Sequence, residues 1–183
     1  EFLTALPVAA SQVKSTVGFG LGSDVDLFAT PPVLDSATDN ADAQAQAVAM
    51  RSAIEALAAV VKQISEGVGA ENVDDVLSAL TADLGDGEID GEANGDQVAI
   101  FEDADQSAAA LELFQQDPGS LCVLDANNDG DCNDPGDKTV AGMAQEVVSE
   151  TANTGSQVDT SGINVETLQE TVTGNLKPAE LNP

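Results

Sequence analysis

Residues 41–68 read ADAQAQAVAMRSAIEALAAVVKQISEGV and decide the fold class. Their larger apolar side chains recur in steps of four and three residues, which places them on one stripe of an α-helix. These residues are Met50, Ile54, Leu57, Val61, Ile64 and Val68. The many alanines raise helix propensity and allow neighbouring backbones to come close. Thr38, Asp39 and Asn40 offer N-caps and Gly67 offers a stop, so the sequence predicts a long central helix over residues 41–67.

Five further segments are predicted to be helices, from their apolar period or from residues suited to a helix start. They are residues 7–17, 73–84, 97–116, 140–152 and 165–173. Pro7 suits a first helical position, and Asn72 and Asn164 suit N-caps. No long strand pattern is present. The sequence therefore predicts an all-α bundle of about five or six helices with long loops, in a single domain over residues 1–183.

Two loops between the predicted helices differ in character. The segment Gly18–Leu34 reads GFGLGSDVDLFATPPVL and is unusually apolar for a loop. We expect it to wrap across the helices and fill gaps left by their alanine-rich faces. The segment Thr154–Gly162 is rich in Ser, Thr and Gly and is expected to be a surface loop.

The charge of the chain excludes several classes of function. The 183 residues include 33 acidic and 5 basic side chains, which gives a formal net charge of −28. This charge disfavours binding to nucleic acids and to anionic membranes, both of which attract Lys and Arg. It also opposes the compact state through self-repulsion, so bound cations, high salt or a basic partner must offset it.

The residue types also argue against catalysis. The chain has no His, Trp or Tyr. It therefore lacks an imidazole base or ligand and the aromatic platforms that sugar-cleaving enzymes use. Neighbouring carboxylates such as Asp74 and Asp75 point to different faces of a helix and are expected to be solvated. We predict that the chain is not an enzyme.

The two cysteines, Cys122 and Cys132, lie ten residues apart around an acidic loop. A disulfide over this span is feasible, and in the chain-entropy model it contributes roughly 2–3 kcal/mol. It would indicate an oxidising compartment. The alternative is two free, half-buried thiols in a cytosolic protein.

The beginning of the chain bears on its location. No apolar run reaches the length of a transmembrane helix, and Pro7, Gln12 and Lys14 break the run that a signal peptide would need. We expect no membrane insertion. If the protein is exported, to the cell surface or the extracellular space, we expect this to be the mature chain or an excised piece.

The sharpest local motif is DANNDGDCNDPGD, residues 125–137. Oxygen-bearing side chains occur at alternate positions and Gly130 takes the sixth, an arrangement that supplies the six to eight oxygens calcium needs. The candidate ligands are Asp125, Asn127, Asp129, Asp131, Asn133, Asp134 and Asp137. The twelfth position is Gly136, so Asp134 or Asp137 must close the shell. The alternative is an Asx-rich turn without an ion.

A second, weaker candidate is DGEIDGEANGD, residues 86–96. Its oxygen donors also alternate, and a glycine again follows the fifth position. The candidate metal ligands are Asp86, Glu88, Asp90 and Glu92. The alternative is that its glycines only end one helix and launch the next.

The D-x-N-x-D-G-D-x-x-D run, with a cysteine inside, resembles the calcium loops of thrombospondin type 3 repeats and related bacterial DxDxDG loops. It departs from the EF-hand pattern because Gly136 stands where that pattern has Glu. The resemblance covers about a dozen residues and implies calcium binding at the run. More loosely, the alanine-rich helices and the DVDL and DGEIDG segments are similar to regions of secreted bacterial lipoproteins and large calcium-binding surface proteins, which implies an extracellular or cell-surface setting.

These observations lead to one expected function and two alternatives. We expect a non-catalytic, calcium-binding structural module, as a domain or subunit of a bacterial surface protein, adhesin or filament. Such a module would work with protein partners or through self-assembly. The first alternative is an apolar small-ligand-binding protein. The second is a halophilic acidic protein without a specific metal.

Overall fold

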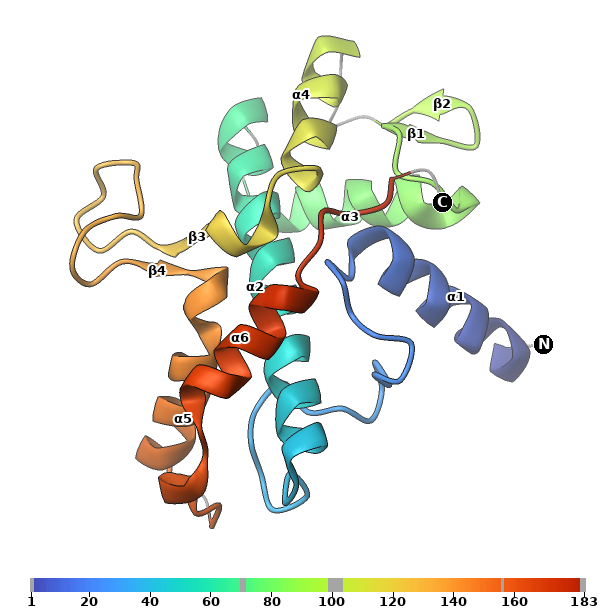
Figure 1. The fold of residues 1–183 in the computed structure, drawn as a ribbon. Helices are drawn as coiled ribbons and strands as arrows, with labels where there is room; N and C mark the ends of the chain where they lie inside the picture. Colours follow the sequence, from blue (N-terminus) through green and yellow to red (C-terminus); the bar gives the residue numbers. More distant parts are fainter. Residues whose placement is uncertain (1, 70–71, 99–103, 156, 182–183) are drawn as a thin grey trace.

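The computed structural model describes residues 2–69, 72–98, 104–155 and 157–181. Within these ranges it holds six α-helices and two short antiparallel strand pairs, joined by long loops (Figure 1). The helices are α1 (Phe2–Val17), α2 (Ala41–Val68), α3 (Val73–Asp83), α4 (Ala104–Phe114), α5 (Met143–Asn153) and α6 (Val165–Asn175). The strands are β1 (Glu92–Ala93), β2 (Asp96–Gln97), β3 (Cys122–Leu124) and β4 (Lys138–Thr139). The predicted all-α class is confirmed.

The central helix α2 organises the molecule. It contacts α3, α4, α5 and α6, which lie around it (Figure 1). At its start the Asn40 side chain accepts a hydrogen bond from the Ala43 N–H at 2.9 Å, which satisfies one of the free donors of the first turn. At its end Gly69 adopts the left-handed conformation with φ 66°, two residues beyond the predicted stop at Gly67.

The buried face of α2 matches the predicted stripe only in part. Ile54, placed on that stripe, is 43% exposed, whereas Ala56 and Val60 are fully buried. The buried residues of the helix are mostly small: Ala47, Val48, Ser52, Ala53, Ala56, Ala59, Val60, Val61, Ile64 and Ser65. Val61 and Ile64 of the predicted stripe are therefore in the core, together with the neighbouring small residues, whereas Ile54 is not.

The core forms two clusters along α2. The cluster around its C-terminal half takes in α3, α4, the buried Ile89 and the residues flanking β3 and β4. The cluster around its N-terminal half joins α5 and α6, with Leu34 from the preceding loop. The apolar loop 18–34 contributes Phe19 to the first cluster, and its ring lies 6.4 Å from that of Phe114. Phe28 of the same loop is 70% exposed.

Two predicted helix boundaries are wrong. The first helix begins at Phe2, so Pro7 lies inside it rather than at its first position. The predicted helix 97–116 does not include Gln97, which pairs with Glu92 in the β1–β2 hairpin. The turn residues Asn94 and Gly95 have positive φ and close that hairpin. Residues 99–103 of that predicted helix, which include Phe101, lie outside the described residues.

Candidate metal site

The acidic loop 125–137 extends from the base formed by β3 and β4 (Figure 1). This base is rooted in the core, because Leu121 and Val140 are buried on either side of it. The Val140 N–H donates a hydrogen bond to the Leu121 carbonyl oxygen at 3.1 Å. The loop therefore leaves and re-enters the body at one fixed place.

A disulfide joins the middle of the loop to strand β3. Cys122 in β3 is bonded to Cys132, with their Cα atoms 5.6 Å apart. Cys132 stands between Asp131 and Asn133 in the sequence. The bond therefore holds the middle of the acidic run against the strand from which the loop starts.

The first and last carboxylates of the loop hold its backbone. Asp125 accepts hydrogen bonds from the N–H groups of Gly130 at 2.8 Å and Asp129 at 3.3 Å. The Gly130 N–H is the main reason that the pKa of Asp125 lies below its usual value. Asp137 accepts from the N–H groups of Ala126 at 2.9 Å and Asp134 at 2.7 Å. Gly130 has φ 93°, which only glycine adopts readily.

Three other carboxylates gather in the interior of the run. Carboxylate oxygens of Asp129, Asp131 and Asp134 all lie within 4.8 Å of one another, and all three residues are exposed. None of the ion pairs between described residues involves an aspartate of this loop. At such separations each pair of negative charges repels by on the order of 1 kcal/mol even in bulk water. The cluster therefore favours a bound positive charge.

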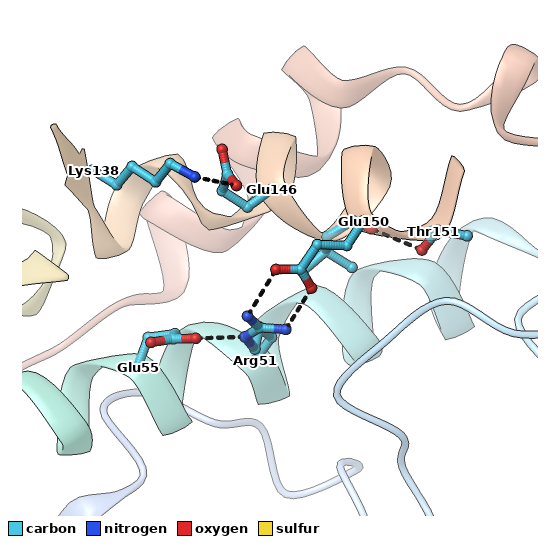
Figure 2. Close-up of polar contacts among 7 residues, drawn as sticks. Arg51, Glu55, Lys138, Glu146, Glu150 and Thr151 are labelled. Carbon is cyan, nitrogen blue, oxygen red and sulfur yellow. Dashed lines mark hydrogen bonds and ion pairs between the residues drawn. The ribbon is translucent and has the colours of Figure 1, made fainter. Parts of the chain in front are cut away.

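The side chain of Asn127 lies between members of this cluster. Its Nδ2 donates to Asp134 at 2.7 Å and to Asp129 at 3.1 Å. The nearest basic residue in the sequence, Lys138, instead pairs with Glu146 of α5 at 2.6 Å (Figure 2). The partial positive charge of the Asn127 amide hydrogens thus lies between two carboxylates, at a place where a bound cation would carry a full positive charge.

The seven predicted ligands therefore take three different roles. Asp129, Asp131 and Asp134 face one another, with Asn127 among them. The Asn133 N–H donates to Asp131 at 3.0 Å, which shapes the turn. The sequence offered Asp134 or Asp137 as the last ligand. Asp134 lies in the cluster, whereas both carboxylate oxygens of Asp137 accept hydrogen bonds from backbone N–H groups.

The second candidate loop is organised differently. Asp86 accepts from the Asn94 N–H at 2.8 Å, and Asp90 accepts from the Glu92 N–H at 3.0 Å. Among the described residues, only one group of three acidic, His or Cys side chains has its possible metal-ligand atoms within 4.8 Å of one another. That group is Asp129, Asp131 and Asp134. Asp86, Glu88, Asp90 and Glu92 therefore do not form such a group.

A carboxylate that the sequence interpretation missed organises this second loop. Asp83, the last residue of α3, is fully buried and accepts from the N–H groups of Asp90 at 3.0 Å and Gly91 at 2.9 Å. Burial raises the pKa of Asp83, against the lowering effect of these two donors. The sequence contains a signal for it, because Asp83 lies seven residues after Val76 on the buried face of the helix.

The single arginine was also missed. Arg51 of α2 bonds to Glu55 at 2.6 Å and makes two bonds to Glu150 of α5, at 3.0 and 3.2 Å (Figure 2). The hydrogen bonds to Glu150 are the first cause of the raised pKa of Arg51. The spacing of four residues indicates the Glu55 pair, but no local pattern indicates a partner 99 residues away. This group joins α2 to α5 and is structural.

Among the described residues, no helix combines the length and the apolar character needed to cross a bilayer. The chain matches no family model, no curated protein and no solved structure, so its function is inferred from the geometry of the site.

Proposed function

We propose that this protein is a non-catalytic extracellular structural module whose loop 125–137 binds calcium. It would serve as a domain or subunit of a bacterial surface protein, adhesin or filament. The mechanism is linkage: calcium binds the folded loop, neutralises repulsion among its carboxylates and so stabilises the folded state.

The convergence of Asp129, Asp131 and Asp134 is the observation that carries the proposal. Rotation of the Asn127 amide would replace its two donated hydrogen bonds with an oxygen ligand. Loop carbonyls and water would complete the shell. An exposed loop of this kind suits calcium, which accepts six to eight oxygens in flexible geometry, better than magnesium, which demands a near-ideal octahedron.

The disulfide supports an extracellular setting. A Cys122–Cys132 bond is compatible with an oxidising compartment and argues against the halophilic cytosolic alternative, for which reduced cysteines are expected. Extracellular calcium sites also work with weak affinity, at roughly 10⁻⁴–10⁻³ M.

Exposed apolar side chains support a protein partner or self-assembly. Val8 of α1 is 68% exposed and Phe28 of the following loop is 70% exposed. A groove of about 560 Å³, lined by Phe28 and by Leu6, Pro7 and Ala10 among others, is open to solvent. Because a ligand-binding protein would enclose an apolar ligand in a deep cavity, this groove gives the small-ligand alternative no specific support.

A thermal melt with calcium and with chelator, at matched ionic strength, tests the proposal. With calcium at about 10–100 times Kd, linkage adds about 1.4–2.7 kcal/mol, or roughly 3–10 °C for a chain of this size. Asp129→Asn removes one clustered charge and should abolish most of this shift. Glu112→Gln, on the exposed face of α4, removes one charge elsewhere and serves as the matched control.

Two results would count against the calcium proposal. One is a melting temperature of the wild-type protein that is the same in calcium and in chelator. The other is a calcium shift that Asp129→Asn and Glu112→Gln reduce equally, because the ion would then act only by general screening.

A further inference from the structure

The loop 125–137 and the helical body are held by different forces. Every residue of the loop is exposed or half-buried, so the loop contributes no fully buried side chain to the core. Its base does contribute, through Leu121 and Val140. Loss of the loop conformation would therefore leave the core of the body intact.

Inside the loop, charge opposes the closed conformation. Residues 125–137 contain five aspartates and no Lys or Arg. The loop is held closed by solvent-exposed hydrogen bonds, from its own N–H groups to Asp125 and Asp137 and from the Asn127 amide to Asp129 and Asp134, and by one covalent bond. Exposed hydrogen bonds exchange readily with water, so the disulfide is the strongest restraint on the loop.

The position of the disulfide links it to the aspartate cluster. Cys132 follows Asp131 directly and precedes Asp134 by two residues. Both cysteines are half-buried rather than enclosed in the core. Opening of the bond would free the segment that carries two of the three clustered carboxylates.

We propose that the Cys122–Cys132 disulfide is a redox-sensitive latch on the acidic loop. Reduction releases residues 125–137 and lowers calcium affinity, while the helical body stays folded. The calcium part of this proposal rests on the function proposed above, whereas the release of the loop does not.

The chemical step is thiol–disulfide exchange with a dithiol. One thiolate of the dithiol attacks a cysteine sulfur, so that a mixed disulfide forms and the other cysteine leaves as a thiolate. The second thiolate of the dithiol then closes its own disulfide and expels the remaining cysteine. Two electrons pass to the protein, and two protons complete its thiols.

Coupling of this kind is reciprocal. If the oxidised loop binds calcium more tightly than the reduced loop, calcium makes the disulfide harder to reduce by the same factor. A tenfold affinity ratio corresponds to a shift of about 30 mV in the reduction potential.

The test compares oxidised protein, protein held reduced by dithiothreitol, and the Cys122→Ser/Cys132→Ser variant. Amide hydrogen exchange is followed at Gly130 and Asp134 in the loop and at Val60 in the body, without calcium. We expect exchange at least about tenfold faster in the loop on reduction and in the variant, with Val60 unchanged. Calcium titrations of the same samples should show Kd raised about tenfold.

The outcomes separate the two proposals. Unchanged exchange at Gly130 and Asp134, or loss of protection at Val60 together with the loop, would overturn the latch. Equal calcium affinity in the oxidised and reduced states would overturn its coupling to the ion. If oxidised protein binds no calcium, the proposed function and this coupling fail. The difference in amide hydrogen exchange between oxidised and reduced protein then still decides whether the disulfide holds the loop closed.

Discussion

The two glycine-bent acidic loops, 86–96 and 125–137, look alike in sequence and differ in what holds them. The first is anchored in the core: Ile89 is 1% exposed, and the buried carboxylate of Asp83 accepts hydrogen bonds from two backbone N–H groups of the loop. The second has no fully buried residue and is held by its own aspartates and a disulfide. Carboxylates at alternate positions therefore do not by themselves bring three carboxylates together. Among the described residues, only the second loop has such a cluster.

The largest expected change in stability comes from removing the Ile89 side chain, which anchors the first loop in the core. Ile89→Ala creates a cavity in the main core cluster and should lower the free energy of unfolding by about 2–5 kcal/mol. Ile54→Ala, at a position 43% exposed, is the matched control and should cost much less. Chemical denaturation measures both. Equal losses would mean that loop 86–96 is not anchored by Ile89.

The glycines give the next contrast. Gly91 and Gly130 both have positive φ, 88° and 93°, where a side chain costs about 1–2 kcal/mol. A Cβ at Gly91 would also lie 2.9 Å from the Ser107 hydroxyl, whereas a Cβ at Gly130 meets open space. Gly91→Ala should therefore destabilise more than Gly130→Ala in denaturant unfolding. The reverse order would contradict the assignment of the buried and the exposed loop.

The pH dependence should differ in sign between the loops. The pKa of Asp83 is raised in the folded state, so its contribution to stability grows as pH falls from neutral through that pKa toward about 4. The pKa of Asp125 is lowered, so its contribution is present above about pH 4 and is lost as pH falls further.

Urea unfolding of Asp83→Asn and Asp125→Asn at several pH values, in calcium-free buffer, tests these signs. The stability of wild type relative to Asp83→Asn should increase on acidification, and that relative to Asp125→Asn should decrease below about pH 4. Parallel profiles would show that the two carboxylates do not differ as described.

Local signals predicted much of the fold. The caps Asn40, Asn72 and Asn164 each accept the expected backbone hydrogen bond, because capping depends only on residues within one turn. The face of α2 was misjudged at Ile54, since which side of an alanine-rich helix is buried depends on helices that arrive from elsewhere in the chain.

The candidate site was predictable to a similar depth. The spacing of the oxygen-bearing residues predicted a metal site in loop 125–137, and the spacing of the cysteines made a disulfide feasible. Spacing did not predict that Asp137 accepts hydrogen bonds from backbone N–H groups while Asp134 joins the cluster. That division follows from the three-dimensional path of the loop. The pairing of Arg51 with Glu150 likewise requires the packing of α5 against α2.

The most direct measurement is a calcium titration of the oxidised protein followed residue by residue in ¹H–¹⁵N NMR spectra. The amide signals of residues 125–137 should shift in a saturable manner, with the largest changes near Asp129, Asp131 and Asp134, while those of residues 86–96 stay in place. Saturable shifts centred on residues 86–92, or no saturable shift in either loop, would contradict the assignment of the calcium site to loop 125–137.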